Sequence, residues 1–516
     1  MLRKAVPPAL AFSLILFALA RYFSRLPHVF DLALDDEAVY MGAGTDFFHK
    51  ILWPPGYDGL YSSYEDGGLY AGLYGLLSVF FSDPIDLYIY GGTLIVAAAV
   101  ICGGAAIYCL SGSTLVAVLI AGPVILSGEL TTWPRVSFAA IAAIAFGLSA
   151  AAAAPSLRIK TALLLCAAYL AAFIRPEFVL SFYLLLALQI GLLLRRPRSV
   201  TGADGIASGL ALLFVAAMSA LWSFPVIQGG ERAFVAFGAH YAVRFAATHP
   251  LAIDPWIDWR TVIAAEFPGA ETVFQASLAA PDKMLGYIAE NIEELAVATV
   301  QVLGTTVRRH VPFAVLWVLA AALWLGTSAR RERWPAPRAE FWLALVFAAP
   351  PLIATITIFP RHHYIVLLLF ALSAAAAAAL RPVRSPLAPV LALAVAIGVA
   401  ASAAPLPAVP QPLLATVLKL REQTGLHRMF EIDGGWCYFM VPRCVEDYAG
   451  WQPDSAPFAA YRQARAIDAI MLSPRLLGYE AVHHEDFARD VAALTTDSGW
   501  RSIDLGGGYT LLRAAD

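Results

Sequence analysis

Charged residues are scarce in this sequence. Of its 516 residues only 14% are Asp, Glu, Lys or Arg, whereas a soluble domain carries about 25%. Hydrophobic residues make up 59% of the chain, and its mean hydropathy is +0.68. This composition excludes an ordinary soluble enzyme and predicts a polytopic α-helical membrane protein whose first partner is the lipid bilayer.

Several other features are also rare or absent. The net charge of −3 provides no basic surface, so no nucleic-acid partner is expected. Five cysteines are too few for a disulfide scaffold. Cys437 and Cys444 lie in a stretch predicted to be exported, and both a disulfide and two free thiols stay open there. No glycine-rich phosphate loop or catalytic triad is found in 412–516, and 506–508 is interpreted as a hairpin turn.

Long apolar runs are what the chain does contain. A membrane-spanning helix needs about 20 mostly apolar residues. Eleven runs are predicted to span: roughly 6–23, 86–110, 113–128, 136–154, 160–174, 177–194, 204–226, 310–328, 340–359, 363–380 and 386–403. The first run has no convincing small-residue cleavage site, so it is predicted to be an uncleaved span. The shorter apolar segment 66–81 is predicted to be a helix lying in the membrane interface.

Basic residues test this span count, because short cytoplasmic loops are rich in Lys and Arg. With Arg3 and Lys4 inside, five of the six predicted cytoplasmic segments carry basic residues, and only the turn 111–113 has none. The acidic loop 24–85, the long loop 227–309 and the C-terminal tail then lie outside. The predicted location is a bacterial inner membrane, with a cytoplasmic N-terminus and a periplasmic C-terminal domain.

The composition changes at the end of the predicted membrane domain, 1–403. Residues 404–411 are proline-rich and are predicted to form a semi-rigid linker. Residues 412–516 alternate short strand-like and helical runs, which predicts a small α/β domain. The predicted strands and helices are 428–432, 469–473 and 509–513, and 457–465 and 485–495, respectively.

Most polar residues beside the spans fall on the predicted outer face. Asp35, Asp36 and Glu37 follow the first span, and carboxylates beside hydrocarbon are candidates for a functional site. A solvated acidic loop is the competing interpretation. The other candidates are Tyr70, Glu129, Arg175, His240, Arg361, His362 and His363. Carboxylates deprotonate hydroxyls, and Arg and His bind phosphate, so the set indicates transfer from a lipid-linked phosphate.

Plainer interpretations compete at two of these positions. Arg175 and Glu177 flank a proline at a helix end, where they can simply snorkel and cap the helix. His240 is interpreted as a structural or interfacial histidine before it is considered a ligand. For the whole chain, the alternative function is a transporter or flippase of lipid-linked sugars. The apolar span centres and the absence of an internal repeat argue against transport.

The layout resembles the multispanning glycosyltransferases of the GT-C fold, in particular the branch of protein O-mannosyltransferases and lipid A aminoarabinose transferases. Asp36-Glu37 resembles the acidic pair in the first external loop of that branch. Gly68-Leu69-Tyr70 is similar to its interfacial segment. Ile174-Arg175-Pro176-Glu177 resembles a signature at the outer end of a middle span, and Arg361-His362-His363-Tyr364 a late motif that opens a span.

The resemblance implies inverting transfer of one sugar from a polyprenyl-phosphate donor to an acceptor hydroxyl of a lipid, glycan or protein. Asp36 would take the proton of the acceptor, with Asp35 or Glu37 orienting it or raising its pKa. Arg361, helped by His362 or His363, would stabilise the leaving phosphate. Glu129 would touch the sugar or the acceptor.

The need for a metal stays open at the sequence level. Asp35, Asp36 and Glu129 present oxygen ligands that suit Mg²⁺ or Mn²⁺. The resemblance implies that no catalytic divalent ion is needed, and the prediction is that no cofactor is bound.

Overall fold

The structure is a computed structural model. It describes residues 2–24, 31–34, 36–51, 68–128, 130, 135–195, 201–222, 225–249, 254–329, 338–380, 385, 387–405, 408, 410–449, 457–483 and 486–515.

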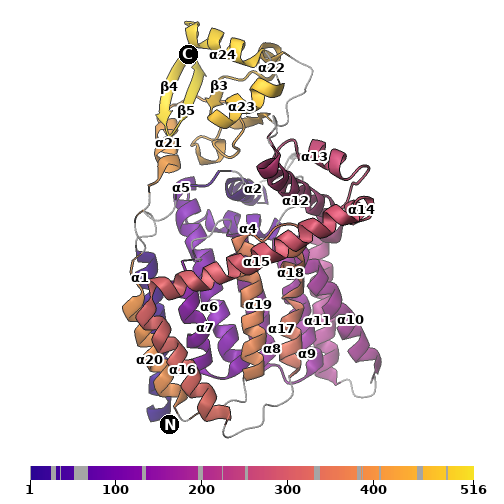
Figure 1. Ribbon diagram of the computed structural model, residues 1–516, viewed down its shortest axis with the longest axis vertical. Coiled ribbons are helices and arrows are strands. Elements are labelled where there is room, and N and C mark those ends of the chain that lie inside the picture. The colour runs from indigo at the N-terminus through magenta and orange to yellow at the C-terminus, as the bar shows by residue number, and fades with distance from the viewer. Residues whose placement is uncertain are drawn as a thin grey trace.

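Long apolar helices form a bundle that makes up most of the molecule (Figure 1). Within the described ranges, seven helical segments are long and apolar enough to cross a membrane. They are Pro84–Ser111, Val136–Ala153, Leu157–Ile174, Pro176–Arg195, Gly202–Ala220, Ala339–Thr357 and His362–Leu380. They correspond to α5 (Pro84–Asp86) through α6 (Gly92–Ser111), α8, α9, η4 (Pro176–Phe178) with α10 (Val179–Arg195), most of α11 (Gly202–Trp222), α17 (Ala339–Val346) with α18 (Ala349–Thr357), and α19. The chain is therefore a polytopic helical membrane protein.

Four more predicted spans correspond to helices that fall outside this set. Helices α1 (Leu2–Tyr22), α7 (Thr114–Leu126) and α20 (Ala388–Ser402) are apolar, but their described apolar parts are shorter than 18 residues. Helix α16 (Val311–Ala329) follows α15 (Pro281–Arg309) at a bend of 109°. The total of eleven spans thus stays a prediction.

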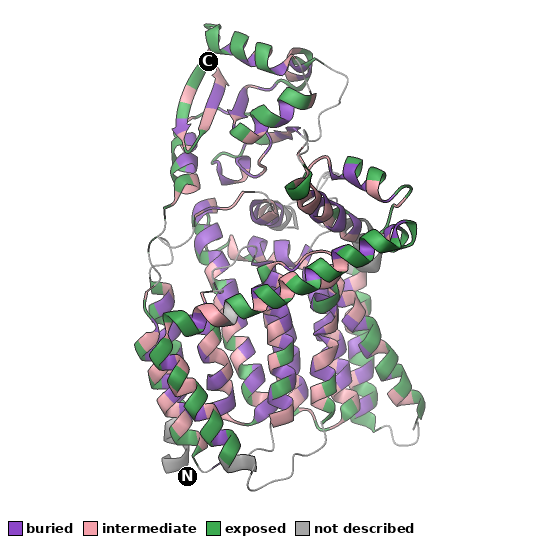
Figure 2. Cartoon of the chain, in the orientation of Figure 1, coloured by how far each residue is buried: buried purple, intermediate pink, exposed green. Residues whose placement is uncertain are grey.

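Small side chains let the bundle helices approach closely. A Cβ placed on Gly147 of α8 would lie only 2.3 Å from the Ala167 Cβ of α9. Close packing of this kind suits helices in lipid, where van der Waals contact replaces the hydrophobic effect between helices. Figure 2 shows buried residues concentrated on the inner helices, while the outer faces of α10, α11 and α16 are exposed.

One end of the bundle, which we call the capped end, carries several short helices and the C-terminal part of the chain, while the N-terminus lies at the opposite end (Figure 1). The helices at the capped end are α2 (Asp36–Ile51), α4 (Gly68–Leu77), α12 (Pro225–Thr248), α13 (Trp259–Glu266) and α14 (Val273–Ala279). Helix α4 falls within the predicted interfacial segment.

The C-terminal unit, from α21 (Pro412–Arg421) to the last strand, is an α/β structure. Its sheet has the order β2-β1-β3-β5-β4, with β1 parallel to β2 and β3, and β5 antiparallel to β3 and β4. The strands are β1 (Arg428–Glu431), β2 (Val445–Tyr448), β3 (Ala469–Leu472), β4 (Trp500–Gly506) and β5 (Tyr509–Ala514). The helices beside them are α22 (Phe458–Arg465), α23 (Pro474–His483) and α24 (Phe487–Thr496).

The edge strands of this sheet, β2 and β4, were not predicted from the sequence. Both β2 and β4 include exposed residues, so neither shows the apolar pattern that identified β1, β3 and β5. The predicted glycine turn is present: Gly506, Gly507 and Gly508 have positive φ and join β4 to β5.

Candidate functional site

Glu37 is a fully buried carboxylate in the first turn of α2. It accepts hydrogen bonds from the hydroxyls of Tyr70 and Tyr74, which lie one turn apart on α4. It also accepts one from the backbone N–H of Arg135, at an N···O distance of 3.2 Å. Burial, reinforced by the neighbouring Glu37 charge, raises the pKa of both tyrosines well above the usual range. Both hydroxyls therefore stay protonated and hold Glu37 in place.

Arg135 completes this buried cluster at the start of α8 (Val136–Ala153). Its Nη1 donates to the Tyr88 carbonyl oxygen at 2.6 Å, and its guanidinium lies 4.6 Å from the centre of the Tyr88 ring. A Cβ on Gly92 would lie 1.8 Å from Nη1, so only glycine leaves room for the arginine. Sequence analysis missed Arg135, although an arginine beside a proline at the end of an apolar run is the same signal that singled out Arg175.

The surroundings of Asp36 differ from those of the adjacent Glu37. It is the first residue of α2 and is only half-buried. No hydrogen bond or ion pair joins its carboxylate to another of the residues the structure describes. Of this adjacent pair, then, one carboxylate is held by three donors, and the other has no hydrogen bond or ion pair to the described residues.

Arg175 joins three bundle helices at the capped end. It is buried at the end of α9 (Leu157–Ile174), and its Nε lies 2.5 Å from the Glu177 Oε1. Its Nη1 donates to the Ser137 Oγ of α8 at 3.2 Å. Its guanidinium also lies 4.3 Å from the ring centre of Tyr364, in the first turn of α19 (His362–Leu380). Its contacts are therefore those of a buried link between helices, not of a side chain that reaches into solvent.

Arg361 and His240 meet on an aromatic surface. The Arg361 guanidinium lies 5.4 Å from the ring centre of Trp256. His240 stacks on Phe359 with ring centres 5.1 Å apart and also meets Trp256 edge-on at 5.2 Å. Burial, with the nearby charges of Arg361 and Arg244, lowers the pKa of His240 to about 3. His240 is therefore neutral at physiological pH, and the arginines supply the positive charge.

Arg244 is a second cation at this surface that sequence analysis missed. It follows His240 by one turn of α12, and its guanidinium lies 5.2 Å from the ring centre of Phe359. It forms ion pairs with Glu290 and Glu294 of α15. Arg244 is thus partly neutralised.

The remaining predicted site residues divide into two groups. His363 is buried, with its ring centre 4.5 Å from that of Tyr364, whereas His362 is exposed. Asp35 and Glu129 lie outside the described residues, so their predicted roles stay predictions. Within the described part of the chain, no group of three or more His, Cys, Asp or Glu side chains is arranged to hold a metal ion.

A continuous set of contacts links the predicted motifs at the capped end. Glu37 meets Arg135, Ser137 follows on the same turn of α8, and Arg175 connects Ser137 to Tyr364. The four motifs therefore form two pairs in direct contact, Glu37 with Tyr70 and Arg175 with Tyr364, and residues at the start of α8 link the two pairs.

No protein-family model, curated protein or solved structure matches this chain. The function is therefore argued from the site.

Proposed function

We propose that this protein is an integral membrane glycosyltransferase of GT-C type, with eleven spans in a bacterial inner membrane. It moves one sugar from a polyprenyl-phosphate donor to an acceptor hydroxyl on the periplasmic face, with inversion at the anomeric carbon. The observation that carries the proposal is the pair at the start of α2, where Glu37 is held by Tyr70 and Tyr74 while Asp36 has no partner among the described residues.

Asp36 is the general base of the proposed reaction. Its carboxylate takes the proton of the acceptor hydroxyl as the acceptor oxygen attacks the anomeric carbon. The bond from the anomeric carbon to the donor phosphate breaks, and its electron pair leaves with the phosphate. Attack from the face opposite the leaving group inverts the configuration.

Arg361 stabilises the leaving phosphate. Charge develops on the phosphate as the glycosidic bond breaks, so a fixed guanidinium binds the transition state more tightly than the ground state. The Trp256 ring beneath Arg361 and the neutral His240 beside it make a surface that suits an anion. The exposed His362 is the second donor to the phosphate in this proposal.

Glu37 positions the base without taking the proton. Three hydrogen-bond donors hold its carboxylate, which is buried and therefore does not reach the acceptor. Because Glu37 and Asp36 are adjacent in the first turn of α2, the contacts that hold Glu37 also fix the helix turn that presents Asp36. Arg135 and the two tyrosines act on the reaction through Glu37.

The test compares Asp36→Asn and Arg361→Ala with wild type in vesicles supplied with extracted lipid-linked sugars and native membrane acceptors. Both variants should melt like wild type. Asp36→Asn should abolish sugar transfer, and Arg361→Ala should lower turnover by about 10²- to 10³-fold, as loss of one oxyanion donor does. Full transfer activity in both variants would refute the assignment. Movement of the lipid-linked sugar across the membrane without transfer would identify a flippase instead.

A further inference from the structure

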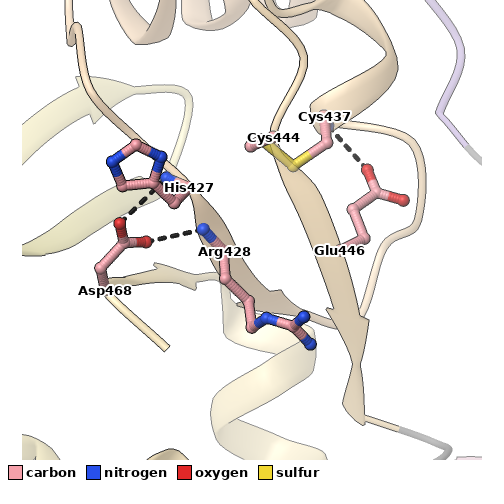
Figure 3. Close-up of a disulfide and its surroundings, with 6 residues drawn as sticks. All are labelled: His427, Arg428, Cys437, Cys444, Glu446 and Asp468. Atoms are coloured by element: carbon pink, nitrogen blue, oxygen red, sulfur yellow. Dashed lines mark hydrogen bonds between the residues drawn. A yellow bond between two sulfur atoms is a disulfide. The ribbon is translucent and has the colours of Figure 1, made fainter. Parts of the chain in front are cut away.

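The C-terminal unit touches both sides of the candidate site. On the first side, a short loop inserts Tyr438 against α2: a Cβ on Gly42 would lie 1.7 Å from the Tyr438 Cδ1. The next residue, Phe439, meets Tyr88 with ring centres 5.7 Å apart. The disulfide Cys437–Cys444 closes this loop (Figure 3). The loop thus packs on the helix that carries Asp36 and Glu37.

Hydrogen bonds and an ion pair also hold the C-terminal unit against this first side. The Arg421 guanidinium binds both oxygens of Asp83, at 2.7 and 3.2 Å, and its Nε donates to the Phe439 carbonyl oxygen at 2.7 Å. The Asp31 carboxylate accepts the backbone N–H groups of Leu413 and Leu414 at 2.9 and 2.8 Å. Helix α21 is therefore tied to the segment just before α2.

On the second side, an ion pair and a histidine–carboxylate contact join α23 to the loop 254–258. The Arg475 Nε lies 2.8 Å from the Asp254 Oδ2, and the His483 Nε2 lies 3.2 Å from the Asp258 Oδ1. Both carboxylates are largely buried, and Ile257 between them packs on the core of the C-terminal unit. The middle of this loop carries Trp256, whose ring meets His240 edge-on and lies 5.4 Å from the Arg361 guanidinium.

The loop is short and closed on itself. Asp254 accepts the backbone N–H of Trp256 at 2.9 Å, and Asp258 accepts the backbone N–H of Asp254 at 3.2 Å. Asp254 therefore holds the Trp256 backbone with one oxygen and Arg475 with the other. If the Arg475–Asp254 ion pair is lost, Asp254 can move, and Trp256 moves with it. The Arg361 guanidinium over the Trp256 ring then loses its support.

From these contacts we propose that the C-terminal unit is a clasp between the two sides of the site, and that Arg475 and Asp254 are positioning residues for Arg361. The clasp holds the Trp256 ring where Arg361 binds the leaving phosphate, while Tyr438 holds α2 on the opposite side. The inference rests on the proposed function for its kinetic consequence, but its structural consequence is independent of any reaction.

Substitutions at Arg475 and Asp254 test the pair directly. Arg475→Ala and Asp254→Ala should each lower kcat, and with it kcat/KM, by about ten- to hundredfold, because Arg361 acts in the transition state and small displacements of a positioned group have effects of this size. Arg475→Lys keeps a cation opposite Asp254 and leaves the Asp254 hydrogen bond to Trp256 in place, so it should retain most of the activity. The matched control is Arg501→Ala, which removes an exposed arginine from the same unit.

Hydrogen exchange provides a readout that needs no activity. In full-length protein in detergent, Arg475→Ala should speed exchange of the amides in 254–263, and Arg475→Lys should keep protection close to that of wild type. Unchanged exchange in Arg475→Ala, or an Arg475→Lys variant as impaired as Arg475→Ala while the protein melts like wild type, would overturn the clasp. If the wild type transfers no sugar, the proposed function fails, whereas the exchange result still decides the clasp.

Discussion

At the scale of single residues, the site depends on two adjacent carboxylates in unlike surroundings. Glu37 is buried and accepts three hydrogen bonds, whereas Asp36 is half-buried at the first position of α2. Sequence analysis placed both in one acidic cluster, because neighbours in sequence share their composition. The positions of α4 and α8 distinguish them, since α4 brings two tyrosine hydroxyls to Glu37 and the start of α8 brings the Arg135 N–H.

Removing one of these hydroxyls should destabilise the protein. Tyr74→Phe leaves the buried Glu37 with one donor fewer, and a hydrogen bond to a charged group contributes about 1.5–3 kcal/mol. We expect a lower melting temperature in detergent. Tyr108→Phe is the control, because Tyr108 is half-exposed on the bundle surface. Equal melting of the two variants would contradict the structural role given to Tyr74.

The buried His240 makes the free energy of unfolding depend on pH. Its folded pKa of about 3 lies below the ordinary value of 6.5, so the unfolded chain takes up the proton first as the pH falls. The stability contributed by neutral His240 is present above pH 6.5 and is lost between pH 6.5 and about 3, by up to about 1.4 kcal/mol per pH unit. His240→Gln should flatten the melting profile in that window.

The exposed His249 provides the comparison for this experiment. His249→Gln should leave the acid-side slope of the melting profile as it is in wild type. A slope that His240→Gln fails to change would show that other groups cause the acid sensitivity.

At the scale of elements, the packing of α2 on α4 fixes the site. A Cβ on Gly44 would lie 1.8 Å from the backbone oxygen of Ala71, and no side-chain rotation relieves a clash with backbone. Gly44→Ala should therefore separate the helices, lower the melting temperature and reduce activity. Gly72→Ala on α4 meets no atom within 4 Å and should be neutral or stabilising by up to about 1 kcal/mol. If the two variants behave alike, the helices do not pack this closely.

Elements also show where local patterns suffice. The segment 66–81 was predicted to be an interfacial helix, and α4 (Gly68–Leu77) is a helix at the capped end. Strands β1, β3 and β5 were predicted because each is a short apolar run. Strands β2 and β4 pair at the sheet edges through backbone hydrogen bonds that place little demand on side chains.

At the scale of the whole molecule, the two termini lie at opposite ends of the bundle (Figure 1). An odd number of spans, such as the predicted eleven, requires the termini to be on opposite sides of the membrane. Alkaline phosphatase fused after the last residue should be active in cells, because the enzyme needs an oxidising compartment. Green fluorescent protein fused there should be dark. A fusion within 196–200, a predicted cytoplasmic loop, should give the reverse pattern, and fluorescence at the C-terminus would contradict the predicted topology.

The whole molecule also brings the C-terminal unit into contact with a candidate site whose residues lie elsewhere in the chain. Its contacts reach Gly42 on one side and Asp254 and Asp258 on the other. These positions are hundreds of residues from α23 and the disulfide loop in sequence. No local pattern in 412–516 indicates that this part of the chain faces both sides of the site.

The sequence by itself determined the class of protein, the apolar helices, the helix at 68–77 and the central strands, because each depends on composition and period over a short stretch. It also singled out Asp36, Glu37, Arg175 and Arg361. Only the tertiary structure decided that Glu37 is held and that Asp36 is not, and that Arg135 binds Glu37. Those facts depend on which helices lie side by side, and contacts between distant segments leave no local signal in the chain.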